Sequence, residues 1–183
     1  MIVSSARPGA HSARRFDAPA SAALPGPHLG LTWRTLDPGD GADVHALWDR
    51  SDAVDVHGDS TTRGELDETL RAAARSGDTL GGFDPEGILR AAAALVLTSR
   101  ADTAEVRLRA TVDPGTRGRG IGKALLGWQD DRARQLLAAS APAGPARIVI
   151  DVGLHQGDRR RLYAAAGFAP EPSGPGTTFA VTL

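Results

Sequence analysis

Hydrophobic and polar residues alternate along several short stretches of the chain, and this alternation predicts β-strands. The clearest stretch is 105–112, Glu-Val-Arg-Leu-Arg-Ala-Thr-Val, in which every second residue is apolar. One face of this strand is therefore expected to pack on a hydrophobic core. Further strands are expected at about 29–36, 78–83, 87–98, 148–152, 167–170 and 177–183.

The strand expected at 87–98 contains an alanine run, 91–94, that suits a helix by propensity alone. Asp84-Pro85-Glu86-Gly87 precedes it, with proline at the second and glycine at the fourth position of a type I turn. Such a turn joins antiparallel strands, so the hairpin context favours a strand.

Apolar residues at helical spacing predict helices between these strands. The longest is expected from about Gly120 to Ala139, with Ile121, Leu125 and Leu126 on its inner face. Three shorter helices are expected around 44–48, from 62 to Gly77, and over 156–166. Helices and strands in this order describe one mixed α/β domain over residues 29–183, without an internal repeat.

Residues 1–28 differ from the rest of the chain. They are rich in Ala, Ser, Pro, Gly and Arg and have no periodic apolar face. A disordered tail is expected there, with an organellar transit peptide as the alternative.

Composition excludes several classes of function. The chain has 183 residues and no cysteine, so disulfides, Cys-ligated metal centres and thiol nucleophiles are excluded. A formal net charge of −1 argues against non-specific nucleic-acid binding. The longest apolar run, 91–97, is far shorter than the roughly 20 residues of a membrane-spanning helix. The histidines have no metal-ligand spacing, so no metal site is expected.

The segment from Val112 to Lys123 is the most informative part of the chain. A strand ends there, a glycine-rich loop with two arginines follows, and the longest helix begins. Unpaired N–H groups and the positive end of the helix dipole favour an anion at such a junction. Glycines let the backbone approach a ligand closely. The alternative is a turn that only packs a helix on a sheet.

Two nucleotide-binding motifs fail on this segment. A P-loop ending at Gly122-Lys123 would need glycine in place of Arg117 and Ser or Thr in place of Ala124. The dinucleotide fingerprint would need a glycine at Lys123.

Two separate motifs resemble those of the GNAT superfamily of N-acyltransferases. Arg117-x-x-Gly120-x-Gly122, preceded by Val112-x-Pro114, is similar to its acyl-CoA signature. The stretch from Leu162 to Phe168, with a tyrosine four residues before Gly-Phe, resembles its second landmark at the right distance. The opening strand, short helices and hairpin are distantly similar to mycothiol-synthase-type acetyltransferases.

This resemblance implies a particular fold and co-substrate. The fold is a twisted, mostly antiparallel sheet of six to seven strands with about four helices. Its fourth and fifth strands, here 105–112 and 146–153, run parallel and splay apart. Acetyl-CoA is the implied co-substrate, without a metal. The implied contacts are the backbone of Ala110 and Val112 for the pantetheine arm, Gln156 beside it, and Arg117, Gly118, Arg119, Gly120, Ile121, Gly122 and Lys123 for the diphosphate.

The resemblance also implies the chemistry. An amine attacks the thioester directly in a ternary complex, and the backbone N–H of Val112 holds the oxyanion. Tyr163 is the implied general acid for the departing thiolate, and its alternative role is packing on the last strands. Glu105 is a weak general-base candidate, Asp151 and His155 are others, and a water chain is a further alternative.

The chain departs from the family pattern at the helix before Tyr163. That helix usually begins with asparagine and has a small residue three positions on, where this chain has Gln156 and Arg159. Gln156 can still hydrogen-bond the pantetheine arm. Arg159 is expected to crowd or re-aim that contact, or to reach the phosphates together with Arg160.

The expected function is transfer of an acetyl group to a primary amine of a small molecule or peptide. Residues 48–62 and the final hairpin are expected to select the acceptor, and one hypothesis is that acidic residues there attract a cationic amine. Alternatives are a catalytically silent CoA-binding module and a binding domain that uses its arginine-containing loop for nucleic acid or another phosphate ligand. The protein is expected to reside in the cytoplasm and to bind neither nucleic acid nor membranes, and a homodimer is possible. The acidic residues of segment 48–62 that could attract a cationic amine are Asp49, Asp52, Asp55 and Asp59.

Overall fold

The structure is a computed structural model, and it describes residues 15–55, 63–100, 103–153, 156–173 and 176–183. One seven-stranded sheet with the order β1-β2-β3-β4-β5-β7-β6 forms its centre. All neighbouring strands are antiparallel except β4 and β5, which are parallel. The strands are β1 (Thr32–Arg34), β2 (Thr79–Phe83), β3 (Leu89–Ser99), β4 (Ala104–Val112), β5 (Ala146–Val152), β6 (Ala169–Ser173) and β7 (Gly176–Thr182).

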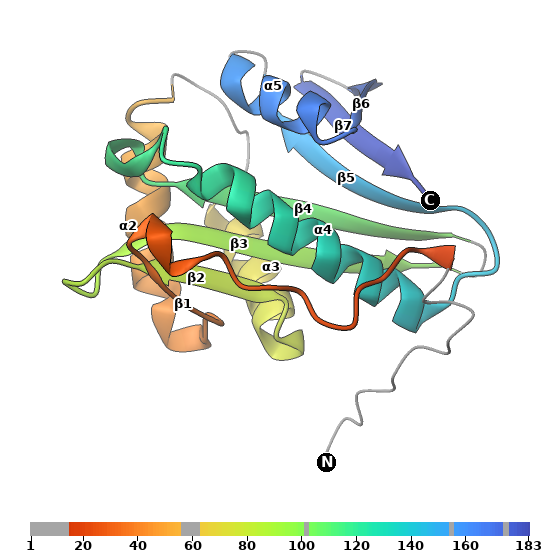
Figure 1. Cartoon of the computed structure of the whole chain (residues 1–183), viewed down its shortest axis with the longest axis horizontal. Coiled ribbons are helices and arrows are strands. Elements are labelled where there is room, and N and C mark those ends of the chain that lie inside the picture. Colours follow the sequence, from red (N-terminus) through yellow and green to blue (C-terminus); the bar gives the residue numbers. More distant parts are fainter. Residues whose placement is uncertain (1–14, 56–62, 101–102, 154–155, 174–175) are drawn as a thin grey trace.

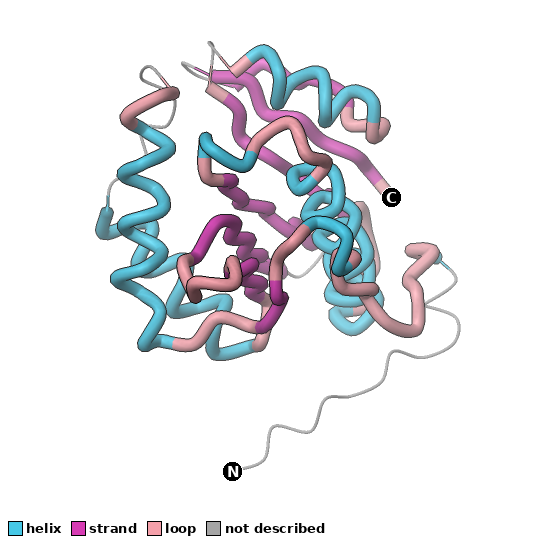
Figure 2. The backbone as a smooth tube through the Cα atoms, turned by 60° about the vertical axis from the view of Figure 1, so that its left-hand side comes forward, coloured by secondary structure: helices cyan, strands magenta, loops and turns pink. Residues whose placement is uncertain are grey.

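Helices cover both faces of this sheet (Figures 1 and 2). On one face lie α2 (Gly41–Asp52) and α3 (Arg63–Ser76). On the other lie α4 (Ile121–Ser140) and α5 (Gly157–Ala165). The expected single α/β domain with a mixed, mostly antiparallel sheet and a parallel fourth and fifth strand is therefore confirmed.

The alanine run lies in the middle of β3, as the hairpin context predicts. Ala91 and Ala93 pack in the core beneath α4, whereas Ala92 packs beneath α2. All three are at most 1 % exposed. Because strand side chains alternate between faces, small residues here let helices approach the sheet from both sides. Burial on a two-sided sheet thus overrides the helical propensity of alanine.

The first strand is shorter than its pattern suggests. The alternation at 29–36 predicts a strand of that length, but β1 contains only Thr32–Arg34. A 3₁₀ turn over Pro27–Leu29 and Gly30, which has a φ of +72°, precede it. Proline and a left-handed glycine do not continue a strand, which explains the difference.

Residues 15–28 do not form the disordered tail expected for 1–28. Phe16 is 1 % exposed and belongs to the main core. Arg15 donates to the carbonyls of Pro142 and Gly144, each at 2.7 Å, and Arg134 on α4 donates to Phe16 O at 3.1 Å. In Figure 1 this segment, coloured red to orange, runs along α4. Residues 1–14 lie outside the described part of the chain.

Candidate active site

The parallel strands β4 and β5 separate before either strand ends. Their pairing runs from Ala104–Ala146 to Leu108–Ile150, and both strands continue beyond it. The two strands diverge towards their carboxyl ends (Figure 1). A stretch of β4 backbone therefore loses its neighbour inside the sheet.

The orientation of this backbone follows from its pairing with β3. Asp113 N donates to Arg90 O at 2.7 Å, so the backbone groups of Asp113 face β3. Because these groups alternate in direction along a strand, those of Ala110 and Val112 face the side that β5 has left. Their carbonyl oxygens can therefore accept hydrogen bonds from groups other than the backbone of a neighbouring strand.

Two arginine side chains donate to these carbonyls. Arg159 Nη2, from α5, lies 3.1 Å from Ala110 O. Arg117 Nε, from the loop after β4, lies 3.1 Å from Val112 O. Arg159 Nη1 also donates to Gln156 Oε1 at 3.3 Å, and this oxygen accepts from Gly153 N at the same distance. The opening between β4 and β5 is thus polar and contains guanidinium groups.

The glycine-rich loop presents open backbone at the start of α4. Gly118 and Gly120 have φ values of +76° and +86°, which favour glycine. A Cβ at Gly118 would meet nothing within 4 Å, and one at Gly120 only Leu29 at 3.9 Å. Ala124 N makes a helical bond to Gly120 O, so the preceding N–H groups, of 121–123, have no acceptor within the helix. This arrangement can bind an anion such as a diphosphate.

The start of α4 lies close to α5. A Cβ on Gly122 would be 3.7 Å from the side chain of Leu162. The fold therefore brings the two sequence motifs, which are far apart in the chain, to one corner of the molecule. Arg119 and Lys123 are exposed there. Arg119 also lines a cavity of about 380 Å³ between the loop, residues 29–31 and the turn at 84–86.

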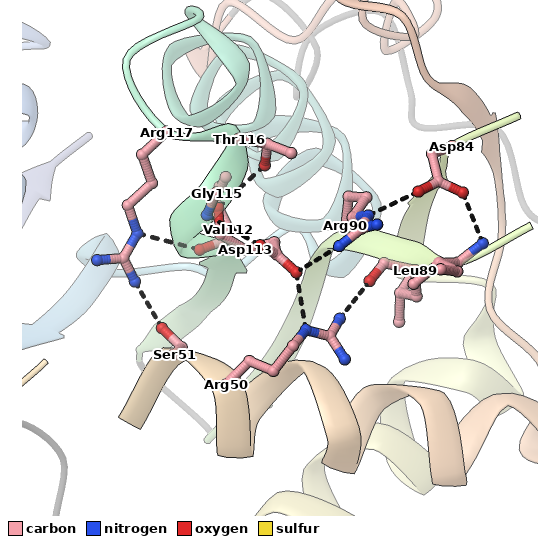
Figure 3. A network of polar contacts seen from close by, with 11 residues as sticks. Arg50, Ser51, Asp84, Leu89, Arg90, Val112, Asp113, Gly115, Thr116 and Arg117 are labelled. Carbon is pink, nitrogen blue, oxygen red and sulfur yellow. Dashed lines mark hydrogen bonds and ion pairs between the residues drawn. The ribbon is translucent and has the colours of Figure 1, made fainter. Parts of the chain in front are cut away.

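Arg117 points towards α2 and not across the glycine-rich loop (Figure 3). Its guanidinium binds both carboxylate oxygens of Asp55, at 2.5 and 2.7 Å, and Ser51 Oγ at 2.7 Å. Burial raises the pKa of Asp55, but hydrogen bonds and charge from Arg117 outweigh it and hold the pKa below its ordinary value. Asp55 is ionised and already neutralised. The pair with Arg117 does not support the hypothesis that Asp55 attracts a cationic acceptor, which stays a prediction.

Asp113 fixes the loop from below (Figure 3). Its carboxylate accepts from Arg50 Nε at 2.7 Å, Arg90 Nη1 at 3.1 Å and Gly115 N at 3.0 Å. Arg90 binds Asp84 as well, at 2.6 Å. Burial raises the pKa of Asp113, but Arg50, the amide of Gly115 and Arg90 together keep it below its ordinary value. These contacts join α2, β3 and the loop, and no pattern in the sequence indicates them.

We expect Asp113→Asn to lower the free energy of unfolding by about 2 kcal/mol at pH 7, because a buried charge-assisted network loses its charge. The depressed pKa makes this contribution fully present above the unfolded value of about 3.9 and lost as pH falls through the folded value. Urea unfolding of both proteins at a series of pH values measures it. A wild-type to variant difference that stays constant below pH 4 would contradict the assignment.

Tyr163 is 7 % exposed and lies on the inner side of α5. Its ring centroid is 6.3 Å from that of Phe168 and 6.0 Å from that of Phe179. These tilted contacts restrict the orientation of the phenol. Tyr163 thus packs on the last strands, and its role as an acid stays a prediction.

Of the general-base candidates, Glu105 lies away from the open backbone of β4, whereas Asp151 directly follows Ile150, the last residue of β5 that pairs with β4. Glu105 is at the far end of β4, about 23 Å along the strand from Val112, and binds Arg107 at 2.9 Å. Asp151 also pairs with Arg107 and accepts from Thr178 Oγ1 at 3.0 Å. Glu105 therefore does not reach the site. His155, like Asp59 of the acidic segment, lies outside the described residues.

The fold of this chain is that of solved GNAT acetyltransferases. A GNAT-family acetyltransferase from Streptococcus pneumoniae matches with a TM-score of 0.61 at 18 % identity, over 84 % of this chain and 99 % of that one. A GNAT superfamily phosphinothricin acetyltransferase from Sinorhizobium meliloti, in complex with AcCoA, matches with a TM-score of 0.55 at 17 % identity, over 84 % and 89 % of the two chains.

A third similar structure is the PaiA N-acetyltransferase from Thermoplasma acidophilum, in complex with coenzyme A. Its TM-score is 0.55 at 17 % identity, over 84 % of this chain and 99 % of that one. No protein-family model matches the sequence, and no curated protein matches it significantly. The fold implied by the two motifs is therefore confirmed, and the distant likeness to mycothiol synthases is not.

The described residues form neither a membrane-spanning helix nor a cluster of metal ligands. Among them, no helix is both long and apolar enough to cross a membrane. Within the same part of the chain, no three His, Cys, Asp or Glu side chains come together as metal ligands would.

Proposed function

We propose that the protein is an acetyl-CoA-dependent N-acetyltransferase that acts on a primary amine of a small molecule or peptide. The observation that supports this most is that the β4 backbone at Ala110 and Val112, which β5 leaves without a neighbouring strand, occurs together with the glycine-rich start of α4. Two of the similar structures contain AcCoA or coenzyme A. The fold and the anion-binding backbone point to the same co-substrate.

In this proposal the edge of β4 and the glycine-rich loop bind different parts of acetyl-CoA. The pantetheine arm adds to β4 as an extra strand would, through the backbone of Ala110 and Val112. The diphosphate binds the N–H groups at the start of α4. Each hydrogen bond to a charged oxygen contributes about 1.5–3 kcal/mol, so several approach the roughly 8 kcal/mol of a micromolar complex.

The reaction forms a bond from the amine nitrogen to the thioester carbon and breaks the carbon–sulfur bond. The N–H of Val112 faces the opening and donates to the developing oxyanion. Tyr163 supplies a proton to the thiolate, and water takes the proton that the amine loses, since the carboxylate of Glu105 is too distant. No step of the reaction proposed here uses a metal ion.

Titration with acetyl-CoA tests the proposal, and we expect a dissociation constant in the micromolar range. Gly120→Ala is expected to weaken binding about tenfold, because keeping a left-handed φ of +86° costs an alanine about 1–2 kcal/mol, so the free loop relaxes out of the conformation that binds the anion and must regain it on binding. Isothermal calorimetry measures both.

Gly127→Ala is the matched control for this change. Gly127 lies within α4, is exposed, and a Cβ there would meet nothing within 4 Å. Its substitution is expected to leave binding unchanged and to stabilise the helix slightly. Equal binding by the two variants would show that the loop does not hold the ligand, and absence of wild-type binding would overturn the proposed function.

A further inference from the structure

Arg159 spans the opening in which the proposed co-substrate would lie. Its guanidinium reaches from α5 to Ala110 O at 3.1 Å, and its own helix end supports it through Gln156 at 3.3 Å. Its charge also contributes to lowering the pKa of Asp55, at the end of α2. The guanidinium therefore lies between α5 and β4, near enough to Asp55 for the two charges to interact.

Arg159 bonds the backbone atom of β4 that an added strand would use, Ala110 O. Ala110 O faces the side of β4 from which β5 has departed, so it is a main-chain acceptor to which an added strand would bond. Arg159 takes this acceptor in the free protein. Arg117 takes Val112 O in the same way, but two bonds to Asp55 and one to Ser51 hold it against α2. Arg159 is thus the side chain that bridges the opening from α5.

We propose that Arg159 closes the pantetheine cleft of the free protein and must leave Ala110 before an acyl-CoA can pair with β4. This proposal rests on the proposed function. Arg159 then competes with the pantetheine arm and lowers the affinity for coenzyme A, in contrast to an arginine that binds the phosphates.

The competition predicts a gain of affinity on removal of the side chain. In the wild type, the ligand must break the bond from Arg159 to Ala110 O before it can bind β4. In Arg159→Ala this bond is absent and no contact with the ligand is lost. We therefore expect Arg159→Ala to bind coenzyme A about tenfold more tightly than the wild type. Pantetheine, which lacks the phosphates, should show the same gain. Adenosine 3′,5′-bisphosphate, which lacks the arm, should bind both proteins equally.

Arg161→Ala is the matched control. It removes the same charge from the same helix, but Arg161 has a side-chain exposure of 78 % and pairs with Asp158 within the helix. We expect its affinity for coenzyme A to equal that of the wild type. Calorimetric titration of each variant with the three ligands, with melting temperatures to confirm folding, makes the comparison. Arg159→Gln, with a shorter polar side chain, replaces Arg159→Ala should the latter not fold.

The outcomes separate this proposal from the proposed function. The closed cleft is supported if the Arg159 variant binds coenzyme A and pantetheine more tightly than both the wild type and Arg161→Ala. This holds also if the wild type binds too weakly to measure. Equal or weaker binding by that variant, with a wild type that binds, overturns the closed cleft and leaves the proposed function intact. Absence of binding to every variant overturns both.

Discussion

Tyr163→Phe is expected to lower the turnover number about 100-fold at saturating acetyl-CoA, once an amine acceptor is in hand. The substitution removes only the phenolic hydroxyl, and general acid catalysis contributes at least this factor. The ring contacts with Phe168 and Phe179 are available to phenylalanine as well. Release of free thiol from acetyl-CoA measures the rate.

Binding is the control for this prediction. The dissociation constant of acetyl-CoA should be the same for Tyr163→Phe and the wild type, because the proposed binding contacts come from the β4 backbone and the glycine-rich loop, whereas the hydroxyl acts only on the departing thiolate. Full turnover in the variant would leave Tyr163 as a core residue and assign the proton to water. Intact binding without turnover of any amine by the wild type would favour the catalytically silent CoA-binding module.

Phe16→Ala is expected to lower the free energy of unfolding by about 3 kcal/mol, which is a typical cost of removing a buried phenylalanine ring. Phe16 is 1 % exposed and packs in the same core as α4 and the sheet. For a domain of this length the melting temperature should fall by about 10 °C. Urea unfolding and thermal melting measure the change.

Leu24→Ala is the matched control on the same segment. Leu24 is 56 % exposed, so its truncation should change stability by less than about 0.5 kcal/mol. If the Phe16→Ala variant were as stable as the wild type, residues 15–28 would not stabilise the domain, and the disordered tail that their composition suggests would be the better description.

The order of elements and the anion-binding corner could be predicted because each rests on local chemistry. Alternation placed β4, helical spacing placed α4, and the glycines between them marked a junction with unpaired amides. The two family motifs then placed α5 beside it. Each of these signals lies within about a dozen residues of sequence, which is the range over which a pattern can be read.

The side-chain contacts at the site could not be predicted because their partners are distant in the chain. Arg117 was expected at the diphosphate, but it binds Asp55, which is 62 residues away. Arg159 and Ala110 are 49 residues apart. An arginine in a glycine-rich loop has the same sequence signal whether it faces a ligand or a neighbouring helix. Phe16 was missed because one aromatic residue among Ala, Pro and Ser makes no periodic pattern.

The anchoring of the loop through Asp113 also bears on how the chain folds. Its partners Arg50 and Arg90 are 63 and 23 residues away, whereas the local bonds of Asp113 reach only as far as Gly115 and Thr116. Because closing such long chain segments is entropically costly, these ion pairs form only after α2 has docked on β3. We therefore expect the glycine-rich loop to be among the last parts of the molecule to become ordered during folding.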